Sequence, residues 1–68
     1  MKMHIRALRV NANLTQDQVS SIMHVAKSTI VSWEAEKTFP RVDQLNALCD
    51  IYRCTMDDIF IPETLTLK

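Results

Sequence analysis

The segment 14–34 constrains the fold most, because it holds two short helical patterns on either side of a tight turn. In the first pattern Val19, Ile22 and Met23 recur at i, i+3 and i+4, the spacing of one helix face. In the second, over about residues 27–35, apolar residues recur three apart and small polar or basic residues fill the other positions. We predict that the apolar residues hold the two helices together while the second presents a polar face outward.

The rest of the chain predicts an all-α fold of five helices, in which the two helices above are the second and third. The other helices are expected over about residues 3–11 and 42–52, and in a short segment after Thr55. Thr15, with Gln18 three positions later, forms a capping box at the start of the second helix. One domain is expected over residues 1–68, with 62–68 as a short tail.

Composition excludes some classes of protein. The chain has 68 residues, 47% of them hydrophobic, which allows one compact core near the lower size limit. No apolar run approaches the roughly 18 residues of a membrane span, and no apolar signal stretch follows the N-terminus. We therefore expect no membrane partner and a cytoplasmic location. In that reducing compartment Cys49 and Cys54 are expected to be buried thiols, with a disulfide as the alternative.

The titratable residues do not form a recognisable chemical site. His4 and His24 do not combine with the two cysteines at a spacing typical of zinc ligands, so we expect no metal. The many serines and threonines are explained by helix caps and polar surface, and no nucleophile, base and orienting group stand together. We expect no cofactor, no small-molecule ligand and no enzymatic activity.

The charges are unevenly distributed, although the net charge is zero. Residues 1–41 contain six basic and three acidic residues, a balance of +3, and residues 42–68 contain two basic and five acidic residues, a balance of −3. A protein polarised in this way can turn a basic face to phosphate and an acidic end away from it. With so few cations to release counterions, nucleic-acid affinity should be modest.

Taken together, these features resemble the Cro/Xre family of phage and bacterial helix-turn-helix regulators over about residues 5–60. The matching residues are Leu8-Arg9, Leu14-Thr15-Gln16, Val19, Val25, Ser28-Thr29-Ile30, Trp33-Glu34, Lys37, Pro40, Leu45, Leu48 and Met56-Asp57-Asp58-Ile59-Phe60. Short matches to this motif arise by chance, but a matching start, end and downstream segment at family spacing do not. The resemblance implies a lambda-repressor-like fold whose third helix enters the major groove of DNA.

The chain departs from the family pattern at three positions in and after the motif. His24 and Glu36 stand where the family usually has glycine, and Ala26 stands where it usually has a Ser or Thr cap. Left-handed geometry at a non-glycine residue costs about 1 kcal/mol, and loss of a helix cap costs about as much. We therefore expect a less stable motif.

The resemblance implies DNA contacts from the second helix, the third helix and the loop after it. The implied residues are Gln16, Lys27, Ser28, Thr29, Ser32, Lys37, Thr38 and Arg41. Lysine can donate to guanine O6 and N7, and serine can hydrogen-bond to several base edges. Loop contacts to the backbone position a protein without specifying sequence. A solvated polar surface is the alternative explanation, and Thr29 could support Ser28 instead.

Two further features concern the orientation of the third helix. Arg9 and Glu34 resemble the family's charge pair between the first helix and the end of the third, the alternative being two unrelated surface charges. A half-buried pair would fix the helix angle more than it would add net stability. Trp33 could stack on bases, but its spacing of three from Ile30 predicts a core position.

The C-terminal end is the expected dimer surface. One recognition helix reads few base pairs, so related repressors bind a palindrome as dimers, with two helices about 34 Å apart. The apolar residues expected at the interface are Phe60, Ile61, Leu65 and Leu67. A patch of this size predicts a weak homodimer.

The leading hypothesis is a sequence-specific transcriptional repressor that binds a double-stranded operator in a prokaryotic cell or phage-infected host. A protein antagonist is a further candidate partner. The alternative is a protein-interaction module of the same fold, acting as an antirepressor or antitoxin partner, and the zero net charge keeps that alternative open. Retention on heparin or nonspecific duplex at low salt separates the two hypotheses.

Overall fold

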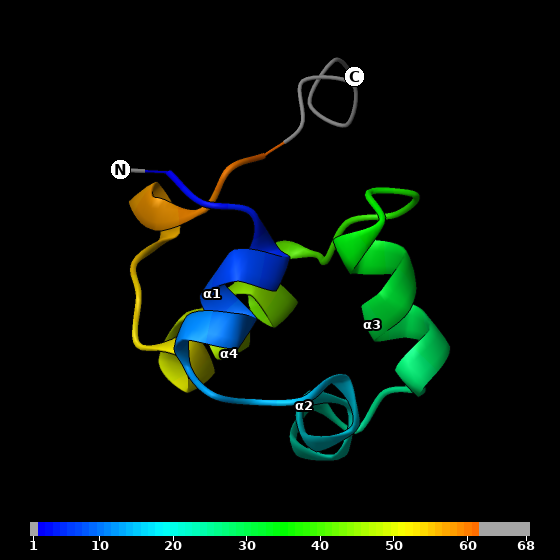
Figure 1. Cartoon of the computed structure of the whole chain (residues 1–68). Helices are drawn as coiled ribbons and strands as arrows, with labels where there is room; N and C mark the ends of the chain where they lie inside the picture. Colours follow the sequence, from blue (N-terminus) through cyan, green and yellow to red (C-terminus); the bar gives the residue numbers. More distant parts are fainter. Residues whose placement is uncertain (1, 62–68) are drawn as a thin grey trace.

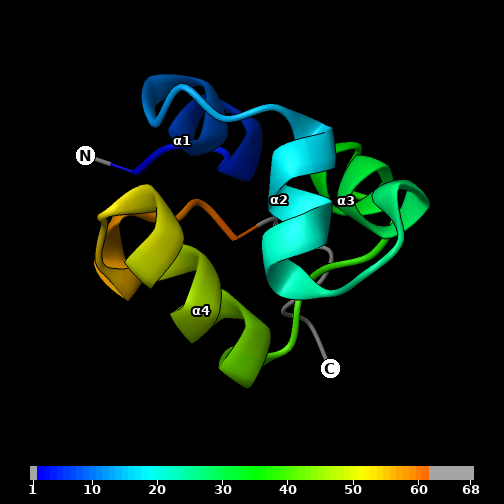
Figure 2. The ribbon, with the colours of Figure 1, turned by 90° about the horizontal axis from the view of Figure 1, so that it is seen from below.

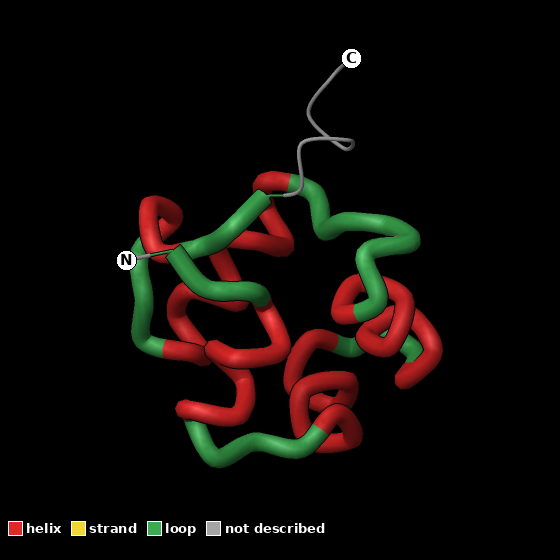
Figure 3. The backbone as a smooth tube through the Cα atoms, turned by 45° about the horizontal axis from the view of Figure 1, so that its top comes forward, coloured by secondary structure: helices red, strands yellow, loops and turns green. Residues whose placement is uncertain are grey.

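The computed structural model describes residues 2–61, which form four α-helices and one 3-10 turn (Figure 1). The elements are α1 (Ile5–Asn11), α2 (Gln16–Met23), α3 (Lys27–Glu34), α4 (Val42–Tyr52) and the 3-10 turn η1 (Met56–Asp58). α1 and α4 lie on one side of the molecule, and α2 packs against α3 on the other (Figure 2). Within residues 2–61 the helices are joined by loops without any strand (Figure 3), which confirms the all-α class.

Side-chain caps at the helix starts explain why α2 and α4 begin where the sequence predicts. The hydroxyl of Thr15 accepts a bond of 3.1 Å from the amide of Gln18, whose side-chain oxygen accepts one of 2.8 Å from the amide of Thr15. This capping box confirms the prediction, and loss of its first bond would cost about 1 kcal/mol. At the start of α4 the amide of Arg41 donates to the side-chain oxygen of Gln44 at 2.8 Å.

The two ends of the chain differ from the predicted helices because they pair with each other. The amide of Met3 donates to the carbonyl of Asp58, and the amide of Phe60 donates to the carbonyl of Met3, both at 2.8 Å. These bonds form an isolated parallel bridge between Met3 and Ile59, so α1 begins at Ile5 and not at residue 3. The same pairing draws Ile59 into an extended conformation, and the fifth element is therefore a 3-10 turn and not an α-helix.

All four α-helices contribute to one apolar core. Its buried side chains are Ile5, Leu8, Val19, Ile30, Trp33, Leu45, Leu48, Cys49, Tyr52 and Ile59. Burying a large apolar side chain contributes about 1.5–3 kcal/mol, so this cluster supplies most of the stability of so short a chain. Trp33 is 4% exposed, which confirms the predicted core position and excludes a stacking surface for bases.

Within residues 2–61, four residues adopt left-handed backbone geometry, and the chain contains no glycine. The φ angles are 60° at Asn13, 58° at His24, 62° at Glu36 and 57° at Arg53. His24 and Glu36 stand where the family usually has glycine, whereas left-handed geometry at Arg53, which ends α4, was not expected from the sequence. Each such position costs about 1 kcal/mol relative to a residue without a Cβ.

Candidate nucleic-acid interface

The turn between α2 and α3 sets the direction in which α3 leaves α2. His24 caps α2 in left-handed geometry, with φ 58° and ψ 41°. Its amide donates to the carbonyl of Ser21 at 3.3 Å, and the amide of Val25 donates to the carbonyl of Ser20 at 3.1 Å. No side chain caps the start of α3, because Ala26 has no acceptor to offer.

The outward face of α3 carries the polar side chains expected of a helix that enters a groove. Lys27 and Ser28 are exposed in the first turn, and Thr29 and Ser32 are half-buried at the margins of the face. Val31 is 43% exposed one turn further along. Of the four polar α3 residues named from the sequence, two are therefore exposed and two are half-buried.

Asp17 and Gln16, near the start of α2, each contact a side chain of α3. Lys27 Nζ lies 3.5 Å from Asp17 Oδ1, in a pair whose side chains are 55% and 75% exposed. Such a pair contributes little in water, so Lys27 can leave it for another anion. Gln16 is half-buried, and its Nε2 donates to Glu34 Oε1 at 3.0 Å. One N–H of the Gln16 side-chain amide is therefore already used in a hydrogen bond within the protein.

The carboxylate of Glu34 at the end of α3 is held by α1. Arg9 Nε donates to Glu34 Oε2 at 2.6 Å and Arg9 Nη2 donates to Glu34 Oε1 at 3.2 Å, while Nη1 donates to the carbonyl of Leu14 at 2.9 Å. The two side chains are only 13% and 5% exposed. The hydrogen bonds that Arg9 donates to Glu34 raise the pKa of Arg9 above its ordinary value. This pair connects the end of α3 to α1, so the two residues are not unrelated surface charges.

The loop after α3 exposes three groups that could hold a sugar-phosphate backbone, Lys37, Thr38 and Arg41. The amide of Lys37 donates to the carbonyl of Ser32 at 3.0 Å, which fastens the loop to the last turn of α3. Arg41 Nε lies 3.7 Å from Asp43 Oδ1, with both side chains at least 75% exposed. The loop therefore extends the polar face of α3 with cations in solvent.

The structure adds Arg6 to this surface, a residue that the sequence analysis did not single out. A groove between α1 and α3 is lined by Arg6 and Gln16, together with Val31 of α3 and Ala35, the residue after it. Arg6 is exposed, and no ion pair joins it to an acid within residues 2–61. Arg6 lies three residues before Arg9, so both residues lie on one side of the helix. This spacing is the sequence signal that could have identified Arg6.

A sequence model described as "Helix-turn-helix" matches residues 5–59, which is most of the chain. The chain belongs to the Cro/Xre-type helix-turn-helix family. It is 30% identical over 61 residues to the HTH-type transcriptional activator BcrR of Enterococcus faecalis, a match that covers 90% of this chain. The match covers 30% of that relative, so this chain spans under a third of its length. No solved structure matches the chain significantly.

In this Cro/Xre-type domain the residues expected at a dimer interface are only partly described. Phe60 and Ile61 are 38% and 39% exposed, and Leu65 and Leu67 lie outside the described residues 2–61. The ring of Phe60 packs against that of His4, with centroids 4.6 Å apart.

The cysteines and the other potential metal ligands of this domain do not form a second site within residues 2–61. Cys49 is buried, Cys54 is half-buried, and both are free thiols. Within residues 2–61 no three His, Cys, Asp or Glu side chains gather as metal ligands. In the same part of the chain, no helix has the length and apolar character needed to cross a bilayer.

Proposed function

We propose that this Cro/Xre-type domain binds double-stranded DNA sequence-specifically, with α3 in the major groove of an operator, and that it represses transcription. The observation that carries the proposal is the exposed polar face of α3. Lys27 and Ser28 project outward, while the buried Ile30 and Trp33 anchor the same helix in the core. A helix fits the major groove, which is about 12 Å wide and presents a distinct pattern of groups for each base pair.

The base contacts are assigned to the exposed residues of α3. Lys27 would donate to guanine O6 and N7 after leaving Asp17, which costs little because that pair is exposed. Ser28 would bond to an adjacent base edge, and Val31 would contact a thymine methyl. Thr29 and Ser32 are half-buried, so they would supply contacts at the edge of the groove.

The backbone contacts are assigned to residues that flank α3. Lys37, Thr38 and Arg41 would hold one stretch of phosphates from the loop after α3, and Arg6 would hold another from the groove between α1 and α3. Gln16 would contribute the amide N–H that Glu34 does not use. Contacts of this kind fix register and orientation, and they make binding depend on salt.

The operator is proposed to be a palindrome bound by two copies of the chain, because one helix reads too few base pairs to select a site. Phe60 and Ile61 would take part in the contact between copies, with Leu65 and Leu67 of the C-terminal segment. Changing Ile61 to Ser should reduce cooperativity on a palindromic duplex and leave thermal unfolding nearly unchanged. Unaltered stoichiometry and affinity would remove Ile61 from the interface.

Repression is the proposed outcome where the operator overlaps a promoter, because bound protein then excludes the polymerase. The relative BcrR carries the name of an activator, so the sign of regulation needs its own measurement. Transcription in vitro from a promoter that contains the selected operator should fall when the protein is added. A rise would assign activation instead.

Selection of bound sequences from a random duplex library tests the proposal as a whole. Lys27→Ala or Ser28→Ala should weaken binding to the selected site by about 1–3 kcal/mol and relax preference at one or two bases. Lys37→Ala is the matched control, since it should weaken all sequences alike and flatten the salt slope by about one unit. Identical behaviour of the two classes would refute the placement of α3 in the groove.

A protein-interaction module of the same fold is the second candidate, favoured by the zero net charge and by the acids that stand beside Lys27 and Arg41. Such a module would act as an antirepressor or an antitoxin partner. It would pass through a heparin column at low salt and retain no duplex, whereas the proposed regulator would be held.

A further inference from the structure

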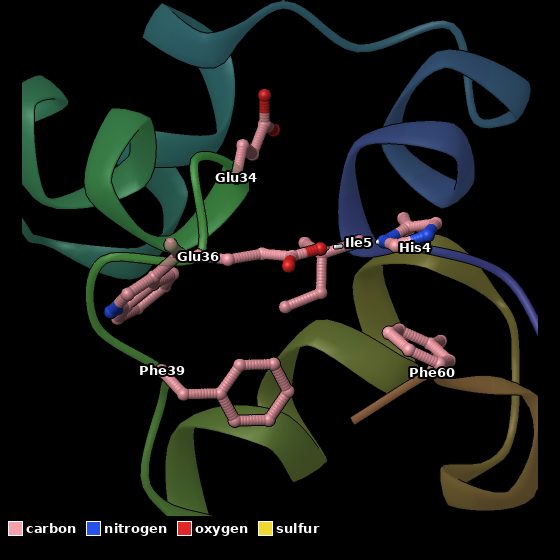
Figure 4. A pocket seen from close by; sticks show the side chains of 7 residues that line it. His4, Ile5, Glu34, Glu36, Phe39 and Phe60 are labelled. Carbon is pink, nitrogen blue, oxygen red and sulfur yellow. Dashed lines mark ion pairs between the residues drawn. The ribbon is translucent and has the colours of Figure 1, made fainter. Parts of the chain in front are cut away.

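His4 joins three segments that are far apart in the sequence. Its Nδ1 lies 2.8 Å from Oε2 of Glu36, just beyond the end of α3. Its ring lies 4.6 Å from the ring of Phe60, tilted by 47°. Figure 4 shows the side chain of Glu36 reaching across to His4, with Phe60 beside the imidazole. The residue before α1 therefore touches both the end of α3 and the C-terminal segment.

Glu36 is the residue through which the loop after α3 changes direction. It stands at φ 62°, and its amide donates to the carbonyl of Trp33 at 3.2 Å. The next two residues, Lys37 and Thr38, are the exposed loop groups assigned to the DNA backbone. Left-handed geometry is unfavourable for a residue with a Cβ, so a side-chain contact that holds Glu36 also helps to hold the two residues that follow.

We infer that His4 is a positioning residue for DNA binding: it holds Glu36, and through it Lys37 and Thr38, more firmly when the imidazole is protonated. The inference rests on the proposed function, because that function assigns Lys37 and Thr38 to contacts with the DNA backbone. Histidine is the side chain whose charge ordinarily changes between about pH 5 and 8. The protonated ring attracts the carboxylate of Glu36 as an ion, whereas the neutral ring offers at most a hydrogen bond.

The charged groups around His4 favour this assignment. Glu34 and Glu36 line the pocket beside His4 from α3 and its loop, and Arg6 lies along the adjoining groove of α1. Glu34 is already bound by Arg9. From the C-terminal side, Asp58 accepts hydrogen bonds from Thr55, and Lys2 donates to the carbonyl of Asp57. Glu36 is therefore the acid that His4 engages.

The size of the effect is limited by solvent. The side chains of His4 and Glu36 are 61% and 39% exposed, and exposed ion pairs are weak. We expect binding of the selected duplex to be about two- to fivefold tighter at about pH 6 than at about pH 8 through this pair. His4→Gln should remove that part of the difference.

The chain offers a matched control, because it contains two histidines. His24→Asn removes the other imidazole, at a left-handed position that Asn tolerates, and should leave the contribution of His4 intact. A cycle with Glu36→Gln separates positioning from simple attraction between the imidazolium and phosphate. In the Glu36→Gln background, His4→Gln should change the pH ratio no further. An equal effect of His4→Gln with and without Glu36 would overturn the inference.

A second measurement needs no DNA and separates this inference from the proposed function. In NMR spectra of the wild-type protein, the amide signals of Lys37 and Thr38 should shift between about pH 6 and pH 8, and His4→Gln should abolish those shifts. Signals that ignore pH in the wild type would also overturn the inference. The protein could also bind no duplex and still show pH-dependent amide shifts that His4→Gln abolishes. That result would support the contact of His4 with the loop and would refute only the proposed function.

Discussion

Arg9 and Glu34 face each other in a bidentate pair, with Nε to Oε2 at 2.6 Å and Nη2 to Oε1 at 3.2 Å. Arg9 also donates to the carbonyl of Leu14, and Glu34 also accepts from the side-chain Nε2 of Gln16. One half-buried network therefore connects α1, the loop before α2, the first residue of α2 and the last of α3. By its geometry, more than by its net energy, this network would orient the proposed recognition helix.

Breaking this pair from one side should destabilise the fold. Arg9→Ala or Glu34→Ala leaves a partner charge in a poorly solvated site and should lower the free energy of unfolding by about 3 kcal/mol. The double replacement Arg9→Met with Glu34→Leu should be milder, because no charge is stranded. Urea unfolding of the wild type, the two alanine variants and the double alanine variant gives the coupling energy, and a value near zero would contradict the network described above.

Arg6 should contribute to DNA affinity through charge alone. Arg6→Gln should weaken binding to specific and nonspecific duplexes alike, and the slope of log K against log salt should fall by about one unit. Arg53→Asn is the control, because it removes the same charge from the end of α4, outside the groove between α1 and α3. A slope that changes equally in both variants would mean that only net charge matters.

Relief of left-handed geometry at the turn should stabilise the domain. His24→Gly removes the Cβ at φ 58° and should raise the free energy of unfolding by about 0.5–1 kcal/mol, after the entropy cost of glycine is counted. For a domain of this size that is a rise in Tm of about 4 °C. Ser21→Gly, within α2, should lower stability by a similar amount. A drop in Tm for His24→Gly would show that its side chain has a stabilising contact.

The free energy of unfolding should fall at alkaline pH, because the thiol of Cys54 ionises more easily in the unfolded state. Burial above all, and a hydrogen bond with Cys49, raise the pKa of Cys54 from 9.0 to about 11. Because the folded state holds this proton more tightly, its contribution is complete below about pH 9 and is lost as the pH rises towards 11. Under reducing conditions the wild type should lose on the order of 1–2 kcal/mol across this range.

The variant Cys54→Ser identifies the group responsible. It should show a shallower loss of stability between the same pH values, since serine does not ionise there. Burial also raises the pKa of Tyr52 above its ordinary value of 10.0, so some alkaline loss should remain. If wild type and variant lose stability in parallel, Cys54 is not the titrating group.

Local pattern alone determined most of the helices and the class of fold. The spacing of Ile30 and Trp33 identified a buried face, and the capping box at Thr15 marked the start of α2 to the residue. The face predicted from Val19, Ile22 and Met23 was wrong at Ile22, which is 50% exposed, whereas Val19 is buried. These signals act between neighbours three or four positions apart, so they are legible without knowledge of the rest of the molecule. The resemblance, not the pattern, supplied the DNA contacts assigned to Lys27 and Ser28, and these remain proposals.

Contacts between distant segments decided the remainder. The bridge between Met3 and Ile59 shortened the first helix and reduced the fifth to a 3-10 turn, since both ends exchanged helical bonds for bonds with each other. The contact of His4 with Glu36, and the position of Arg6 beside α3, depend on how α1 packs against α3. Periodicity carries no information on partners thirty residues away. Periodicity shows which face of a helix is buried, whereas only the packing of the whole chain decides which residues of other segments that face contacts.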